Sequence, residues 1–146
     1  MLDKQKCQEN FKAKIHCSQQ VLGELAEELG YDREEAYRFA NAFGGGMSKG
    51  DTCGAVTAAL IAVGMRYGNS TPGDLEADAL CVEKARLFQE EFIRHHGSTI
   101  CRQLLGYDFT YPEQRLAARE SGKLFELCPT LVMDAIEIFR QLEATS

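Results

Sequence analysis

The feature that most constrains this sequence is the segment from Cys53 to Tyr67, CGAVTAALIAVGMRY, which is apolar on nearly every helical face and rich in small residues. A helix that is hydrophobic all round belongs in the centre of a domain or in a membrane. Crossing a bilayer takes roughly 20 apolar residues, and Asp51 and Arg66 bound this shorter run, so no membrane insertion is expected. The segment therefore predicts a central, buried helix.

The remaining apolar residues recur mostly at helical spacing, and no stretch alternates convincingly with the period of two that is typical of a strand. Apolar stripes of this kind run through residues 11–29, 36–43 and 75–93, and a last helix is expected to begin at Cys128 and Pro129. We predict an all-α fold: a single compact helical domain over residues 1–146, with about five to six helices around the central small-residue-rich helix.

Charge and cysteine content limit the function. The chain has 22 acidic and 16 basic residues, a net charge of −6, which argues against a nucleic-acid partner because phosphate binding needs a basic face. The N-terminal residues MLDKQKCQENFKAKIHC contain no apolar signal core, so a cytoplasmic location is expected. In a reducing compartment, six cysteines indicate metal ligation or thiol redox chemistry rather than structural disulfides.

Three of the cysteines fall in the first turn of a predicted helix, where free N–H groups and the helix dipole stabilise a thiolate. They are Cys53, Cys101 and Cys128. The glycine-rich loop before Cys53 offers further backbone N–H groups, which makes Gly45, Gly46 and Gly54 the candidates for binding a cofactor, a sulfide or a thiolate. We expect Cys53 to be the most reactive thiol, with a lowered pKa.

Sequence spacing excludes two familiar cysteine sites. No C-x-x-C occurs and neighbouring cysteines are at least ten residues apart, so neither a zinc ribbon nor a thioredoxin-type motif is present. Cysteines on separate helices can still converge in a bundle. The alternative is that each packs as a small buried hydrophobe.

The string GGGMSKGDTCGAVTAALIAVGMRYG and the flanking cysteines resemble the C_GCAxxG_C_C family of redox-active proteins over nearly the whole chain. The family is defined by four cysteines and a CGAxxG motif, whose last glycine is replaced here by Ala58. The resemblance implies a redox function. The matching cysteines are Cys17 in HCSQQVL, Cys53 in CGA, Cys101 in CRQLLGYD and Cys128 in CPTLVMDAIEI. Cys7 and Cys81 have no counterpart.

Three functions are left open. The first is thiol–disulfide chemistry, in which Cys53 attacks and one of the other three family cysteines resolves. The second makes the same four cysteines, Cys17, Cys53, Cys101 and Cys128, the ligands of an iron–sulfur cluster or zinc. The third is a non-catalytic helical interaction module with packing cysteines. The redox partner is unknown from sequence, and a homodimer is among the options for assembly.

Overall fold

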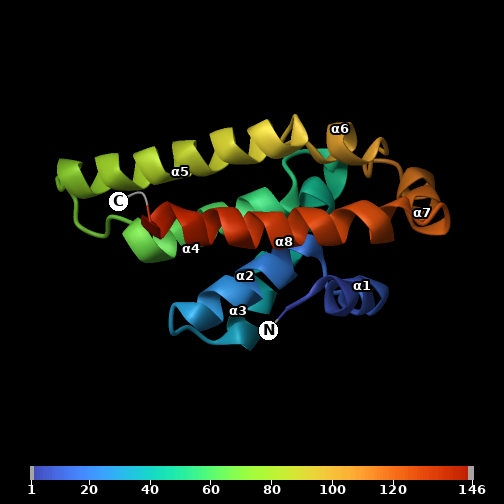
Figure 1. Cartoon of the computed structure of the whole chain (residues 1–146), viewed down its shortest axis with the longest axis horizontal. Coiled ribbons are helices and arrows are strands. Elements are labelled where there is room, and N and C mark those ends of the chain that lie inside the picture. Colours follow the sequence, from blue (N-terminus) through green and yellow to red (C-terminus); the bar gives the residue numbers. More distant parts are fainter. Residues whose placement is uncertain (1, 145–146) are drawn as a thin grey trace.

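The computed structural model describes residues 2–144, which form an all-α domain (Figure 1). The α-helices are α1 (Lys4–Lys12), α2 (Cys17–Glu28), α3 (Arg33–Ala40), α4 (Gly54–Tyr67), α5 (Leu75–His96), α6 (Cys101–Leu105), α7 (Pro112–Glu120) and α8 (Lys123–Ala144). Two short turns, η1 (Asn41–Phe43) and η2 (Gly46–Gly50), precede α4. None of the helices within residues 2–144 is long and apolar enough to cross a membrane.

The prediction of an all-α fold is confirmed, but five to six helices is too few, because residues 2–144 form eight α-helices. The apolar stripe that begins at Phe11 is divided between α1 and α2. Lys14 has a φ of 67°, in the left-handed region, so no single helix can run through it. The chain therefore turns between Phe11 and Cys17, and α1 packs separately against α8.

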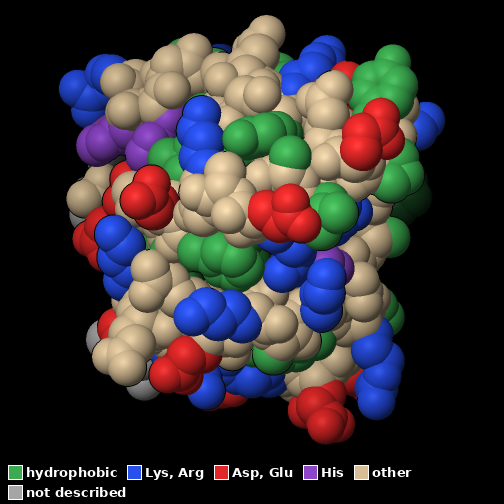
Figure 2. Space-filling model, turned by 90° about the vertical axis from the view of Figure 1, so that its right-hand side faces the viewer, with side chains coloured by type: hydrophobic (Ala, Val, Ile, Leu, Met, Phe, Trp, Pro, Cys, Tyr) green, Lys and Arg blue, Asp and Glu red, His purple; other side chains and the backbone are tan. Residues whose placement is uncertain are grey.

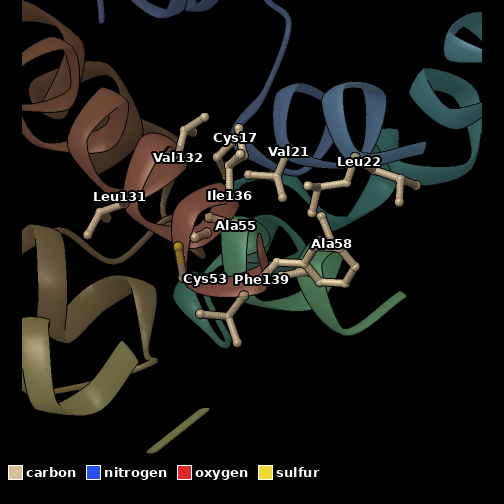
Figure 3. Packing of buried hydrophobic residues seen from close by; sticks show 14 of the residues in the cluster. Cys17, Val21, Leu22, Cys53, Ala55, Ala58, Leu131, Val132, Ile136 and Phe139 are labelled. Carbon is tan, nitrogen blue, oxygen red and sulfur yellow. The ribbon is translucent and has the colours of Figure 1, made fainter. Parts of the chain in front are cut away.

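Helix α4 is central, as its composition predicts. It packs against α2, α5 and α8 (Figure 1). Its alanine side chains have no exposed surface. Ala58, at the motif position usually occupied by glycine, has no exposed surface, so a methyl group fits this contact. Buried residues of α8, among them Leu131, Val132, Ile136 and Phe139, complete the core (Figure 3). Each such side chain contributes roughly 1.5–3 kcal/mol through burial.

The glycine-rich segment before α4 forms a left-handed turn. Gly45, Gly46, Met47 and Ser48 have φ values of 66°, 63°, 60° and 62°. A left-handed conformation costs about 1–2 kcal/mol at each non-glycine residue, so tertiary contacts must hold this turn in place. One such contact anchors Asp51, the residue that follows the turn: its carbonyl accepts a hydrogen bond from the Cys101 N–H over 2.6 Å.

Helix α8 begins at Lys123, five residues before the predicted start at Cys128. Pro129 lies inside the helix and has no N–H to donate to the carbonyl of Phe125. That carbonyl instead accepts a hydrogen bond from Gln8 Nε2 of α1 over 3.1 Å. A side chain distant in sequence thus satisfies the acceptor that proline leaves free, and Cys128 is not at a helix N-terminus.

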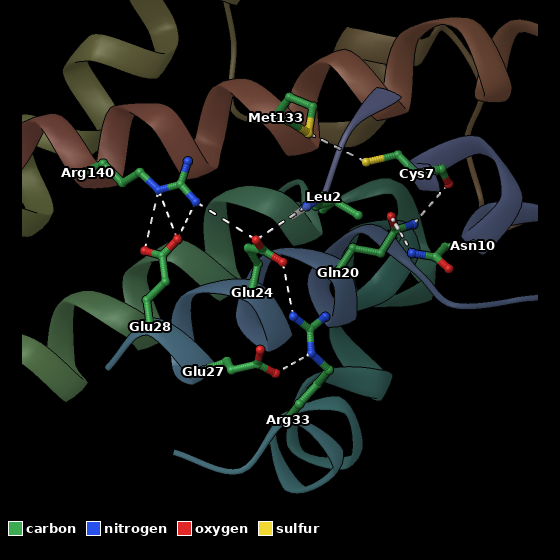
Figure 4. Close-up of polar contacts among 10 residues, drawn as sticks. All are labelled: Leu2, Cys7, Asn10, Gln20, Glu24, Glu27, Glu28, Arg33, Met133 and Arg140. Atoms are coloured by element: carbon green, nitrogen blue, oxygen red, sulfur yellow. Dashed lines mark hydrogen bonds and ion pairs between the residues drawn. The ribbon is translucent and has the colours of Figure 1, made fainter. Parts of the chain in front are cut away.

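A polar cluster on α2 ties the N-terminal helices to α8 (Figure 4). Glu24, only 8% exposed, accepts a hydrogen bond from Arg33 Nη2 over 3.1 Å and lies 3.9 Å from Arg140 Nη2. Nearby, the thiol of Cys7 donates to the sulfur of Met133 over 3.7 Å. Burial, with smaller effects of Asp3 and Glu24, raises the pKa of Cys7 to about 12, so this thiol is a packing group.

Candidate functional site

The four cysteines that match the family pattern line one cavity of about 560 Å³, a volume that includes its opening to solvent. Cys17 is the first residue of α2, Cys53 precedes α4, Cys101 is the first residue of α6, and Cys128 lies in α8. Figure 3 shows Cys17 and Cys53 next to core residues of α8. Cys7 and Cys81 are not among the lining residues, and all six cysteines are free thiols.

Cys17 is the thiol whose surroundings favour the anion. The thiol of Cys53 donates a hydrogen bond to its sulfur, and the backbone N–H groups of Gly45, Ser18 and Gly54 also reach it. Together these donors outweigh burial and lower the pKa of Cys17 to about 7. A thiolate that accepts several N–H bonds at the start of a helix has the environment of a reactive cysteine.

The expectation of a lowered pKa at Cys53 is wrong. Donation of its hydrogen bond to Cys17, together with burial, raises the pKa of Cys53 well above the ordinary value, and only the N–H of Ala55 acts in the opposite direction with a smaller effect. The residue caps α4, and its own N–H donates to the Thr99 carbonyl over 2.7 Å. The amides of the glycine-rich turn thus act on Cys17 in place of Cys53.

The other two cysteines are neutral thiols in the cavity wall. Burial and the charge of Cys17 raise the pKa of Cys101 to about 12, although Arg115 and Arg102 partly oppose this. Burial also raises the pKa of Cys128 well above its ordinary value. Neither is therefore a competing nucleophile near neutral pH.

Two of the three predicted backbone-binding glycines line the cavity, Gly45 and Gly54. A Cβ atom at Gly54 would lie 2.6 Å from the Cys17 sulfur, so only glycine allows the start of α4 to approach that sulfur. Gly46 is not among the lining residues. It lies next to Cys101, because a Cβ added at Gly46 would be 2.9 Å from the Cys101 Cβ.

Sequence reasoning missed the cationic part of the cavity, Arg115 and Arg119 of α7, and it did not assign His16 to the site. The Arg115 guanidinium lies 5.0 Å from the ring centre of Phe109. The pKa of His16 lies below its ordinary value. Burial is the largest cause, and the charges of the two arginines add to it. Two arginines at i,i+4 on a polar helix look like an exposed face in a sequence, so no local signal identified them.

The four cysteines do not form a ready-made metal centre. Within the part of the chain that the structure describes, no group of three or more His, Cys, Asp or Glu side chains is arranged to hold a metal ion. The arrangement is instead one hydrogen-bonded pair, Cys17 and Cys53, with two further thiols in the same wall. Such a pair is suited to two-electron thiol–disulfide exchange.

Comparison with known proteins gives one family. Its model matches residues 15–142, from just before the first cavity cysteine to the end of the buried stripe of α8, and it is described as "Putative redox-active protein (C_GCAxxG_C_C)". No curated protein and no solved structure matches the chain.

Proposed function

Because the chain belongs to the C_GCAxxG_C_C family, we propose that it is a thiol–disulfide redox protein in which Cys17 is the nucleophile and Cys53 the resolving thiol. The observation that carries this proposal is the hydrogen bond from the Cys53 thiol to a Cys17 sulfur that also accepts backbone N–H bonds. One sulfur is thereby held as the anion beside a second that is held protonated. This is the starting state of a dithiol that reduces disulfides.

The reaction proceeds in two exchanges. The Cys17 thiolate attacks one sulfur of a substrate disulfide RSSR, the substrate S–S bond breaks, and one RS⁻ leaves a mixed disulfide on Cys17. Cys53 then loses its proton, its sulfur attacks the Cys17 sulfur, and the second RS⁻ leaves. One of the two leaving thiolates takes the Cys53 proton, so the dithiol loses two electrons and becomes the Cys17–Cys53 disulfide while RSSR becomes RSH and RS⁻.

The electrostatics of Cys17 and Cys53 determine which of the two thiols reacts first. Before attack, the pKa of Cys53 is raised by its hydrogen bond to Cys17, by burial and by the charge on Cys17. A mixed disulfide on Cys17 removes both the charge and the thiolate acceptor. Burial still raises the pKa of Cys53 and the Ala55 N–H opposes it with a smaller effect, so this pKa falls toward its ordinary value only after the first bond has formed.

The test is reaction of the reduced protein with one equivalent of a small disulfide, followed by thiol counting and peptide mapping. We expect two thiols lost per chain and a Cys17–Cys53 cross-link. Cys17→Ser should abolish the fast reaction, and Cys53→Ser should trap a stable mixed disulfide on Cys17. Cys81→Ser, which changes a cysteine outside the cavity, is the matched control and should behave as the wild type.

Three results would contradict the proposal. Fast reaction at Cys53 in the Cys17→Ser variant would reverse the roles of the two thiols. One zinc ion or one iron–sulfur cluster per chain after anaerobic purification would favour the four-cysteine centre. Cavity thiols that react no faster than those of the unfolded chain would favour a non-catalytic helical module.

A further inference from the structure

The cavity contains two half-buried guanidinium groups with no carboxylate beside them. Of the seven other arginines in the described part of the chain, only the exposed Arg38 forms no ion pair. The six that do are Arg33, Arg66, Arg86, Arg94, Arg102 and Arg140. Arg115 and Arg119 form none, and the residues around the cavity include no Asp or Glu. Burial and the charge of Arg115 lower the pKa of Arg119, so the two cations are held together against desolvation and repulsion.

The contacts that Arg115 and Arg119 make within the chain leave N–H groups available for an anion. Arg119 Nη2 donates to the Phe11 carbonyl over 3.2 Å, and Arg115 stacks on Phe109. A guanidinium carries five N–H donors, so most of them are free for a ligand. Charged groups that are withdrawn from water are normally paired, and two such cations in a wall without Asp or Glu are complementary to an anionic ligand.

One of the two cations, Arg115, also lies close to the reactive sulfur. A Cβ atom at Gly45 would be 3.3 Å from Arg115 Nη2, and the N–H of this same Gly45 donates to the Cys17 sulfur. One residue of backbone thus separates the guanidinium from the nucleophile. In a ligand whose anionic group is bound by Arg115, a short hydrocarbon chain would separate that group from the atom that Cys17 attacks.

We propose that the substrate of this cavity is a small organic disulfide carrying a carboxylate, which Arg115 and Arg119 bind while Cys17 attacks its sulfur. The inference rests on the proposed function and names its substrate class. The remaining wall is apolar, with side chains such as Leu104, Leu105 and Leu131, and accommodates the hydrocarbon part of such a molecule.

The first test measures anion recognition without requiring a disulfide reaction. Iodoacetate and iodoacetamide alkylate the same thiol and are nearly the same size, but only iodoacetate is charged. The rate ratio of the two reagents at Cys17, divided by the ratio for a small free thiol, reports the cationic wall. We expect it to exceed one and to fall about tenfold in Arg115→Gln and in Arg119→Gln.

Two further variants sharpen this test. Arg115→Lys keeps the charge but loses the planar fork and should keep only part of the preference for iodoacetate. Arg94→Gln removes a charge from the exposed side of α5, outside the cavity, and should leave the ratio unchanged. An equal ratio in wild type and both arginine-to-glutamine variants would overturn the inference.

The second test uses three short-chain disulfides that differ mainly in charge: dithiodipropionate, hydroxyethyl disulfide and cystamine. The reduced protein should be oxidised fastest by the anionic compound and slowest by the cationic one, and the arginine variants should lose this order. Equal rates for all three would overturn the substrate class while the proposed function stands. If no disulfide oxidises the pair but the alkylation ratio still depends on the arginines, the redox function fails and the anion site is supported.

Discussion

Gly54→Ala tests directly how the Cys17 thiolate is stabilised. The new methyl carbon would lie 2.6 Å from the Cys17 sulfur and 2.9 Å from the Phe43 carbonyl oxygen, whereas ordinary contacts are about 3.5–4.0 Å. One side is backbone, so the sulfur must move by about 1 Å and lose N–H donors. A hydrogen bond to a charged group contributes about 1.5–3 kcal/mol, and 1.36 kcal/mol corresponds to one pKa unit, so the pKa of Cys17 should rise by roughly 1–2.

The assay is the rate of Cys17 alkylation by iodoacetamide against pH, with mass spectrometry to assign the site. Gly64→Ala is the matched control in the same helix, because nothing lies within 4 Å of its added Cβ. It should leave the profile unchanged and stabilise the fold by up to about 1 kcal/mol, since alanine is the better helix former. A Gly54→Ala profile that coincides with the wild type would refute the role assigned to the close approach of α4.

The remaining predictions concern the other thiols and the strained turn. Replacing Cys7 and Cys81 together should leave the reactivity of Cys17 unchanged in the alkylation assay, and Cys7→Ser should be less stable than Cys7→Ala because it buries a hydroxyl with no oxygen or nitrogen acceptor at the Met133 contact. Met47→Gly should raise the free energy of unfolding by about 1 kcal/mol in denaturant titrations, because glycine adopts positive φ without strain; unchanged or lower stability would show that the methionine side chain offsets the strain. In reducing buffer, the free energy of unfolding should rise from about pH 7 to about pH 8.5, because Cys17 loses its proton at a lower pH in the folded chain than in the unfolded chain. It should fall above about pH 8.5, because the thiols with raised pKa values, such as Cys7 and Cys101, are then charged only in the unfolded chain. A stability that keeps rising to pH 10 would contradict the raised values.

Much of the fold is encoded in local sequence patterns. The apolar segment around Ala58 predicts a central helix, and the stripe that ends at Leu142 predicts the buried face of α8. What local patterns missed depended on partners elsewhere in the chain. Pro129 is tolerated inside α8 because Gln8 of a distant helix bonds the free carbonyl, and no pattern near residue 129 indicates that contact.

The sequence identified the cysteines of the cavity, but it did not predict its arginines or which thiol has the lowered pKa. The family motif identifies Cys17, Cys53, Cys101 and Cys128, and these do line one cavity. Proximity to the glycine-rich loop in sequence suggested that its amides act on Cys53. The loop instead turns left-handed and directs the Gly45 N–H to Cys17, so the lowered pKa belongs to the other member of the pair.

The left-handed turn links the strain in the loop to the placement of the thiols. Its positive-φ residues are held by contacts beyond the turn, where the Cys53 N–H bonds the Thr99 carbonyl, the Cys101 N–H bonds the Asp51 carbonyl, and Arg102 bonds the Gly50 carbonyl over 3.2 Å. These bonds fix the backbone of two cavity cysteines while they hold the turn that supplies an N–H donor to a third. Loosening this segment would therefore release strain and at the same time raise the pKa of Cys17, so stability of the turn and reactivity of the thiol are physically coupled.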